Sequence, residues 1–216
     1  MNLKESIDDF RAQAIPQIPD DIIGLMQAAG EALTATGLAG RALGTGDPAA
    51  AFTLPNANGE PVSLGTLLQR GPVVISFYRG GWCPYCNLEF RALQEVQGEI
   101  ESLGASLVAI SPQLPDQSLT TVEKNELSFE VLSDVGSKVS DAYGLTFSLD
   151  EALRPVYRKW GADVPALNGD PDWKLPLPAT YVVDTNGCIA HCFVDEDYTQ
   201  RMEPAEILEA LRNLQS

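Results

Sequence analysis

The stretch 73–86 constrains the fold of this chain more than any other part of its sequence. Its first six residues read Val-Val-Ile-Ser-Phe-Tyr, and this apolar run rich in branched side chains predicts a buried strand. A pair of glycines then breaks the strand, and Cys83 and Cys86 open a helix that we expect over roughly Cys86 to Leu103. The chain therefore presents a strand, a tight turn and two cysteines at the start of a helix.

Cysteines at that position predict redox chemistry. Free N–H groups and the positive end of the helix dipole stabilise a thiolate, which is the nucleophilic form of cysteine. A strand followed by a dithiol at a helix start is the redox signature of a thioredoxin-like fold. We therefore expect an α/β domain of this type, with a central mixed β-sheet flanked by helices.

Two other interpretations of the pair have less support. A zinc site needs further ligands, and Cys188, His191 and Cys192 lie in a predicted strand without the spacing of a zinc finger. Two inert core cysteines would be ordinary, because free cysteine is often buried. Trp82 before the pair and Pro84 within it argue against inert packing.

Composition excludes several classes of protein. The 216 residues are enough for one full core, and the formal net charge of -16 argues against partners such as nucleic acid or an anionic membrane. The first residues turn polar at once, no apolar run matches a bilayer-spanning segment, and we expect a cytoplasmic protein. The chain has a single histidine, so it offers almost no residues for Ser-His-Asp or Cys-His catalysis. We expect no metal, flavin or haem cofactor, because sulfur carries the electrons.

The chain divides near residue 46. Residues 1–46 predict an N-terminal helical extension, with helices over 2–14 and from 20 to about 43, followed by a Gly-Thr-Gly-Asp-Pro boundary. Residues 47–216 predict the thioredoxin-like domain. The apolar faces of the extension are not obviously needed by that domain, so we expect a homodimer to which the extension contributes.

The rest of the chain alternates between predicted strands and helices. We expect a helix opened by a capping box of Ser148 and Glu151 and ending near Trp160, then a functional loop over 161–177. Asn186-Gly187 predicts a type I′ hairpin. Further strands are predicted at 105–111, 129–133, 178–184 and 188–194, a hairpin at 52–64, and helices at 116–126, 135–143 and 204–214.

Several of these segments resemble peroxiredoxins, in particular the alkyl hydroperoxide reductase and thiol-specific antioxidant group. The resemblance covers about 49–214 and implies the same thioredoxin-like fold. It is carried by residues 52–55 (Phe-Thr-Leu-Pro), 61–64 (Pro-Val-Ser-Leu), 77–78 (Phe-Tyr), 131–134 (Val-Leu-Ser-Asp), 142–144 (Ala-Tyr-Gly) and 181–187 (Tyr-Val-Val-Asp-Thr-Asn-Gly).

The active-site motif departs from that family. In an ungapped register the peroxidatic cysteine of peroxiredoxins falls on Cys86, their threonine on Cys83 and their proline on Arg79, while Glu89 matches a glutamate that often follows. Their second active-site arginine falls on Pro178, which instead matches the cis-proline of thioredoxins. Trp82 before the first cysteine is similar to the start of the thioredoxin site, and the Cys-Pro-Tyr-Cys tetrapeptide is that of dithiol glutaredoxins.

The resemblance implies thiol-dependent reduction of hydrogen peroxide or organic hydroperoxides by Cys83 and Cys86. Thioredoxin or glutathione would regenerate the dithiol. Two alternatives stay open: a thioredoxin- or glutaredoxin-like disulfide oxidoreductase, and a non-enzymatic redox-sensing interaction protein.

The roles of the individual cysteines are expectations too. Helix electrostatics favours Cys83 as the thiol of lower pKa. Arg79, a cation beside the dithiol, would lower the pKa of a thiolate further. For peroxide the family register favours attack by Cys86, and we expect Cys83 to exchange with the reductant. We expect Cys83 and Cys86 to form the disulfide, and Cys188 and Cys192 to be structural thiols that cannot pair along one strand.

Overall fold

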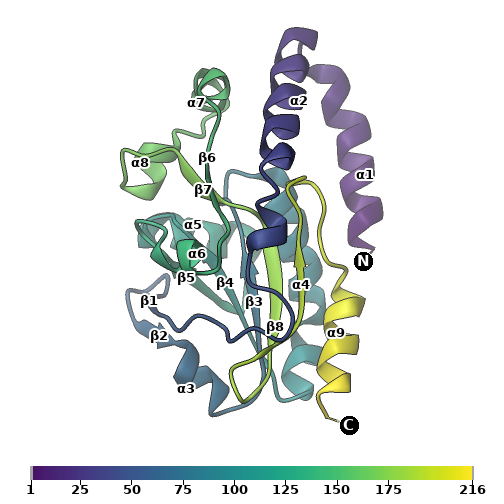
Figure 1. The fold of residues 1–216 in the computed structure, drawn as a ribbon, viewed down its shortest axis with the longest axis vertical. Helices are drawn as coiled ribbons and strands as arrows, with labels where there is room; N and C mark the ends of the chain where they lie inside the picture. Colours follow the sequence, from purple (N-terminus) through teal and green to yellow (C-terminus); the bar gives the residue numbers. More distant parts are fainter. Residues whose placement is uncertain (1, 216) are drawn as a thin grey trace.

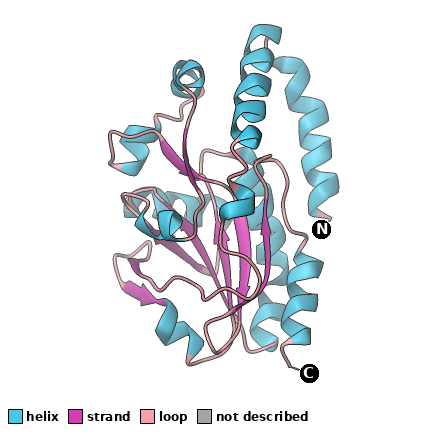
Figure 2. Ribbon diagram, in the orientation of Figure 1, coloured by secondary structure: helices cyan, strands magenta, loops and turns pink. Residues whose placement is uncertain are grey.

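The computed structural model describes residues 2–215, which form a central five-stranded mixed sheet flanked by helices (Figures 1 and 2). The strand order is β5-β4-β3-β8-β9. Strands β3 (Val73–Phe77), β4 (Ser106–Ser111) and β5 (Glu130–Ser133) run parallel, whereas β8 (Ala179–Val183) is antiparallel to β3 and β9 (Ile189–Val194) is antiparallel to β8. This is the fold class that the sequence predicts.

Helices cover both faces of the sheet because the central strands are apolar on both sides. On one face α4 (Pro84–Ser102) and α9 (Pro204–Asn213) share a core with Val74 and Val182. On the other face α3 (Leu64–Leu68) and α6 (Lys138–Ala142) pack over Ile75 and Val183. Helix α5 (Pro115–Asn125) packs beside β5 at the edge of the sheet. All five residues of β3 are buried, as expected for a central strand.

Both predicted hairpins exist, but not with a type I′ turn. Strands β1 (Thr53–Pro55) and β2 (Pro61–Ser63) pair across residues 56–60, and β8 joins β9 through 184–188. In each turn the glycine after asparagine, Gly59 or Gly187, is left-handed, and its N–H donates to the carbonyl three residues earlier. No asparagine among residues 2–215 has positive φ. The type I′ expectation is therefore wrong, and each turn is a type I turn followed by a left-handed glycine.

The segment between α6 and β8 differs most from the sequence prediction. A long helix opened by Ser148 is absent from it: Ser148 ends strand β6 (Thr146–Ser148), and Asp150 instead accepts a hydrogen bond from the Ala152 amide. A short 3-10 turn (Glu151–Leu153) leads into α7 (Arg154–Lys159). The expected loop 161–177 contains α8 (Val164–Asn168) and β7 (Lys174–Pro176), which pairs with β6. We call residues 145–177 the inserted segment; it has its own apolar cluster around Trp173.

Helix α1 (Leu3–Ala14) belongs to the main core. Leu3 and Ile7 are buried in the cluster that also contains α4 and α9 residues. The backbone N–H groups of Leu3 and Lys4 donate to the Glu203 carboxylate, at 3.2 and 2.6 Å, so the free amides at the start of α1 are capped by the loop before α9. The domain of 47–216 therefore uses part of the extension as core.

Helix α2 (Asp20–Ala35) has no buried residue along its length and lies beside α1 (Figure 1). It ends eight residues before the expected Leu43, because Gly37 takes a left-handed conformation and a separate 3-10 turn (Ala39–Arg41) follows. Residues 20–41 contain a window with a mean hydropathy of 1.2, long and apolar enough by composition to cross a membrane. The continuous 16-residue helix would rise only about 24 Å, short of a bilayer core of about 30 Å.

Candidate active site

The dithiol lies after the end of β3, at the start of α4. Cys83 is the N-cap of α4, Pro84 is its first residue, and Cys86 lies in the first turn. The helix therefore begins two residues before the predicted start at Cys86, since proline is favoured at the first helical position. Both cysteines are reduced, and they are 1% and 0% exposed. The positive end of α4 is thus directed at two buried sulfurs.

The two glycines before the dithiol are required by close contacts. Gly80 has a φ of 151°, and a Cβ there would come within 2.3 Å of Trp82 Nε1. A Cβ on Gly81 would come within 2.3 Å of Thr121 Oγ1 in α5. Glycine therefore lets the turn fold tightly beneath Trp82 and against α5.

Amide side chains fix the shape of this turn. Asn87 Nδ2 donates to the carbonyls of Gly81 and Cys83, each at 2.9 Å, and its own Oδ1 accepts from Asn125. Gln113 Oε1 accepts from the Gly81 N–H at 2.7 Å. These buried bonds hold the Cys83 backbone in one position, because each replaces a water contact that the interior cannot supply.

Arg79 lies beneath the dithiol in an aromatic cage. Its guanidinium carbon is 4.4, 5.1 and 5.5 Å from the ring centroids of Tyr198, Trp82 and Tyr157. Nη2 donates to Tyr157 Oη at 2.5 Å, and Nε has no hydrogen-bond partner. Arg79 is 2% exposed, and within residues 2–215 it forms no ion pair with a carboxylate. Tyr157 and then Cys83 are the groups that most favour the charged form of this buried guanidinium.

A second buried arginine serves the other sulfur. Arg201 Nη2 donates to Cys86 Sγ at 3.4 Å, and its Nε donates to Glu89 Oε2 at 2.6 Å. The Arg201 and Glu89 side chains are each 2% exposed, and Ser76 and Thr180 donate to the other Glu89 oxygen. Glu89, which the sequence predicts as a supporting residue, thus contacts Arg201, and Arg201 in turn contacts Cys86.

The two sulfurs have opposite pKa shifts. Burial raises the pKa of Cys83, but a hydrogen bond from Cys86 and then the charges of Arg79 and Arg201 outweigh it and lower that pKa to about 6. Burial, the hydrogen bond to Cys83 and the charge on Cys83 raise the pKa of Cys86 well above its ordinary value. Cys83 is therefore the thiolate at neutral pH and Cys86 is its hydrogen-bond donor, as helix electrostatics predicts.

We expect thiolate absorbance at 240 nm to appear in the reduced protein as the pH rises through about 6. Because the folded pKa lies below the unfolded one, this ionisation stabilises the folded reduced chain most fully above the unfolded pKa, and that contribution is lost as pH falls through 6. The Cys83→Ser variant should lack the transition. Its persistence in that variant would assign the low pKa to another thiol.

The sequence also singles out Arg79, Pro178 and the two cysteines near β9. The family register points Arg79 toward Cys86, whereas in the structure its charge lowers the pKa of Cys83, and its backbone N–H forms a hydrogen bond that lowers the pKa of Cys86. Pro178 is buried just before β8, but its peptide bond is trans, so the cis-proline expectation is wrong. Cys188 is exposed and Cys192 is half-buried with Thr45 Oγ1 at 3.8 Å, so both lie in the β9 region away from the dithiol.

Sequence reasoning missed Arg201, Tyr157, Tyr198 and Asn87. Arg201 lies 115 residues from Cys86 in a loop without periodicity, and Tyr157 comes from the inserted segment. No short-range pattern joins them to the dithiol. Only Asn87, adjacent to Cys86, offered a signal, because an asparagine side chain near a helix start often bonds to nearby backbone groups.

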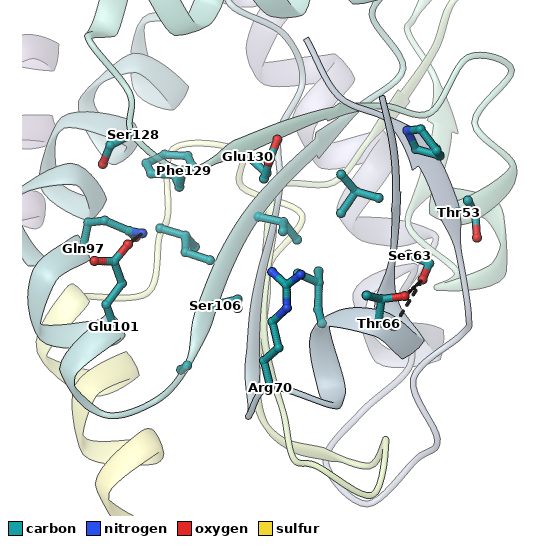
Figure 3. Close-up of a pocket in the computed structure, with 16 residues that line it drawn as sticks. Thr53, Ser63, Thr66, Arg70, Gln97, Glu101, Ser106, Ser128, Phe129 and Glu130 are labelled. Atoms are coloured by element: carbon teal, nitrogen blue, oxygen red, sulfur yellow. Dashed lines mark hydrogen bonds between the residues drawn. The ribbon is translucent and has the colours of Figure 1, made fainter. Parts of the chain in front are cut away.

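A separate groove of about 590 Å³ lies at the amino ends of β4 and β5 (Figure 3). Arg70, Gln97, Glu101 and the starts of β4 and β5 line it. The dithiol follows the carboxyl end of β3, whereas this groove lies at the amino ends of the strands, and it contains neither cysteine of the pair. This groove therefore does not include the dithiol.

Comparisons with known proteins identify relatives of this chain. Residues 45–192 match the model of the AhpC/TSA family. The chain is 33% identical over 114 residues to a putative peroxiredoxin of Mycobacterium tuberculosis, covering 53% of this chain and 74% of that protein. It is 31% identical over 166 residues to a chloroplastic peroxiredoxin Q of Sedum lineare, covering 76% and 74%. The crystal structure of peroxidoxin BcpB from Mycobacterium tuberculosis superposes with a TM-score of 0.64 and 26% identity, covering 81% of this chain and 99% of that one.

Proposed function

Because this chain belongs to the AhpC/TSA family, we propose that it is a thiol-dependent peroxidase of the peroxiredoxin type that works through Cys83 and Cys86. The observation that carries this proposal is a reduced, buried dithiol at the start of α4 with two buried arginines, whose charges lower the pKa of Cys83 and one of which, Arg201, donates a hydrogen bond to Cys86. Such cations stabilise both a thiolate and the oxygen that leaves when an O–O bond breaks.

The reaction runs in two steps on the chain. The Cys83 thiolate attacks the terminal oxygen of the hydroperoxide, an S–O bond forms, the O–O bond breaks, and the alkoxide leaves and takes up a proton as an alcohol. The Cys86 sulfur then attacks the Cys83 sulfenic acid, the S–S bond forms and water leaves. The charge distribution favours Cys83 for the first step, in contrast to the Cys86 that the family register implies.

An external thiol completes the cycle. Thioredoxin or glutathione would attack the Cys83–Cys86 disulfide and restore the dithiol by exchange, with two electrons passing from reductant to peroxide. The exposed neighbourhood of Pro84 offers the approach, since the sulfurs themselves are covered. We place this reaction in the cytoplasm, where such reductants are abundant.

We expect steady turnover when the reduced protein is supplied with hydrogen peroxide or an alkyl hydroperoxide and a thioredoxin or glutathione system. Peptide mapping of the peroxide-treated chain should then show a Cys83–Cys86 disulfide with Cys188 and Cys192 still thiols. A single oxidation without turnover with any reductant would support the redox-sensing alternative. A dominant bridge from Cys86 to Cys188 or Cys192 would contradict the proposed second step.

A second candidate is a thiol-disulfide oxidoreductase. It is favoured by the N-cap thiolate of Cys83 with the protonated Cys86 as its donor, an arrangement equally suited to attack on a disulfide. A glutathione mixed disulfide, included in the same assay, separates the two activities. Faster turnover of that substrate than of either peroxide would make the oxidoreductase the better description.

We also propose a homodimer that uses the outer face of α2. Leu25 on α2 and Ile15 just before it are 37% and 40% exposed. We expect the full chain to sediment as a dimer, and the double variant Leu25→Glu/Ile15→Glu to sediment as a monomer. Leu119→Glu is the matched control, because Leu119 is 39% exposed but lies on α5. A monomeric wild-type chain would mean that α2 covers only its own domain.

A further inference from the structure

We propose that Tyr157 is a positioning residue that holds the Arg79 guanidinium against Cys83, so that the inserted segment controls the ionisation of the attacking sulfur. This inference rests on the proposed function only in naming Cys83 as the attacking sulfur. Nothing in the sequence motif of the dithiol includes Tyr157.

Arg79 is buried with few hydrogen-bond partners for its guanidinium. A guanidinium has five N–H donors, and burial without partners is costly. The hydrogen bond from Nη2 to Tyr157 Oη is the one side-chain hydrogen bond of Arg79 among residues 2–215, and its Nε has none. Arg201, in contrast, is fixed by Glu89 as well as by backbone carbonyls. Tyr157 is therefore the single oxygen that sets the orientation of Arg79.

The aromatic rings around Arg79 cannot replace that oxygen. Cation–π contacts with Trp82 and Tyr198 attract the charge, but they tolerate sliding and rotation of the guanidinium over the ring face. The short bond to Tyr157 fixes one edge of the guanidinium, and with it the place of the charge that lowers the pKa of Cys83. Loss of the hydroxyl would leave the cation in the cage without a fixed direction.

Tyr157 itself is held by the inserted segment. It lies on α7, is 6% exposed, and packs in the cluster of that segment beside Leu153 and Trp173, with its ring 5.5 Å from the Trp82 ring. Met26 and Ala29 of α2 pack against the same cluster. The inserted segment, which lies outside the central sheet, thus contacts Arg79 through the Tyr157 hydroxyl and acts on the dithiol through Arg79.

The test is the ionisation of Cys83 in Tyr157→Phe, read from thiolate absorbance against pH. The groups whose charges or hydrogen bonds act on Cys83 are Arg79, Arg201, Cys86, Tyr85 and Tyr198. All five are retained in the variant, so a change reports on the orientation of Arg79. We expect the midpoint to rise by about one pH unit, because a displaced cation stabilises the thiolate less.

The rate of the peroxide step should follow the thiolate fraction. At pH 6 it should fall about fivefold in Tyr157→Phe, whereas at pH 8.5 it should be close to that of the wild type. Tyr143→Phe is the matched control, since the Tyr143 hydroxyl is buried without a hydrogen-bond partner and lies away from the dithiol in the cluster beneath α6. That variant should leave the midpoint unchanged.

A double-mutant cycle separates positioning from a general structural effect. In an Arg79→Gln background, Tyr157→Phe should shift the Cys83 midpoint no further, because the residue through which Tyr157 acts is gone. Equal shifts in both backgrounds, or no shift in the wild-type background, would overturn the proposal. The absorbance titration requires no turnover. A chain that is inactive toward peroxide would therefore contradict the proposed function, and the titration would still decide whether Tyr157 positions Arg79.

Discussion

Replacing Cys83 by serine is expected to reduce the rate of the first reaction with peroxide by about a thousandfold or more. The variant removes the thiolate of low pKa and leaves Cys86, whose pKa burial raises. A protonated thiol is a poor nucleophile, so the adjacent Arg201 does not by itself restore the reaction. The measurement is the pre-steady-state consumption of hydrogen peroxide by reduced protein, followed by trapping of sulfenic acid.

Cys86→Ser is the matched comparison. It should keep the fast peroxide step, accumulate a trapped sulfenic acid on Cys83, and lose turnover because the disulfide cannot form. Its Cys83 pKa should stay below the ordinary value, since the serine hydroxyl can donate the hydrogen bond that Cys86 donates and both arginines remain. If instead Cys83→Ser reacts fast and its sulfenic acid is trapped on Cys86, the family register identifies the attacking sulfur and our assignment is wrong.

The sequence predicts the region around the dithiol well because its elements are long and periodic. Strand β3 is an unbroken apolar run, and α4 spans 19 residues with one apolar face, so both have strong local signals. The place of Cys83 at the helix N-cap gives the direction of its pKa shift, but the charges of Arg79 and Arg201 also lower that pKa, and Arg201 is a distant contact. The strand and the helix themselves need no knowledge of distant contacts.

The parts that sequence reasoning misses depend on distant contacts. Strands β6 and β7 have three residues each and exist by pairing with one another across the inserted segment, so neither shows periodicity of its own. Arg201 reaches Cys86 only because α9 and its preceding loop pack against α4 and α1. The ungapped register could place the motif residues, but it could not show which sulfur each arginine faces.

Glu89→Gln is expected to lower the free energy of unfolding of the reduced protein by about 3–5 kcal/mol, measured by urea denaturation. The substitution keeps the size of the side chain but leaves Arg201 as a buried cation without its carboxylate. Burial raises the pKa of Glu89, which shows the cost of its charge, and the charge of Arg201 acts in the opposite direction to offset part of that cost. Removing one partner of such a buried pair is therefore expected to cost more stability than replacing both partners by apolar residues.

Glu99→Gln provides the control on the same helix. Glu99 pairs with Arg212 at 3.5 Å, but the two side chains are 60% and 57% exposed, so its loss should cost under about 1 kcal/mol. The double variant Glu89→Leu/Arg201→Met should recover much of the loss seen in Glu89→Gln, because neither charge is then buried. Such recovery with slow peroxide reduction would show that the pair is kept for the chemistry of Cys86 rather than for stability. A loss for Glu89→Gln no larger than that for Glu99→Gln would mean that water reaches Arg201 and that the pair is not a buried one.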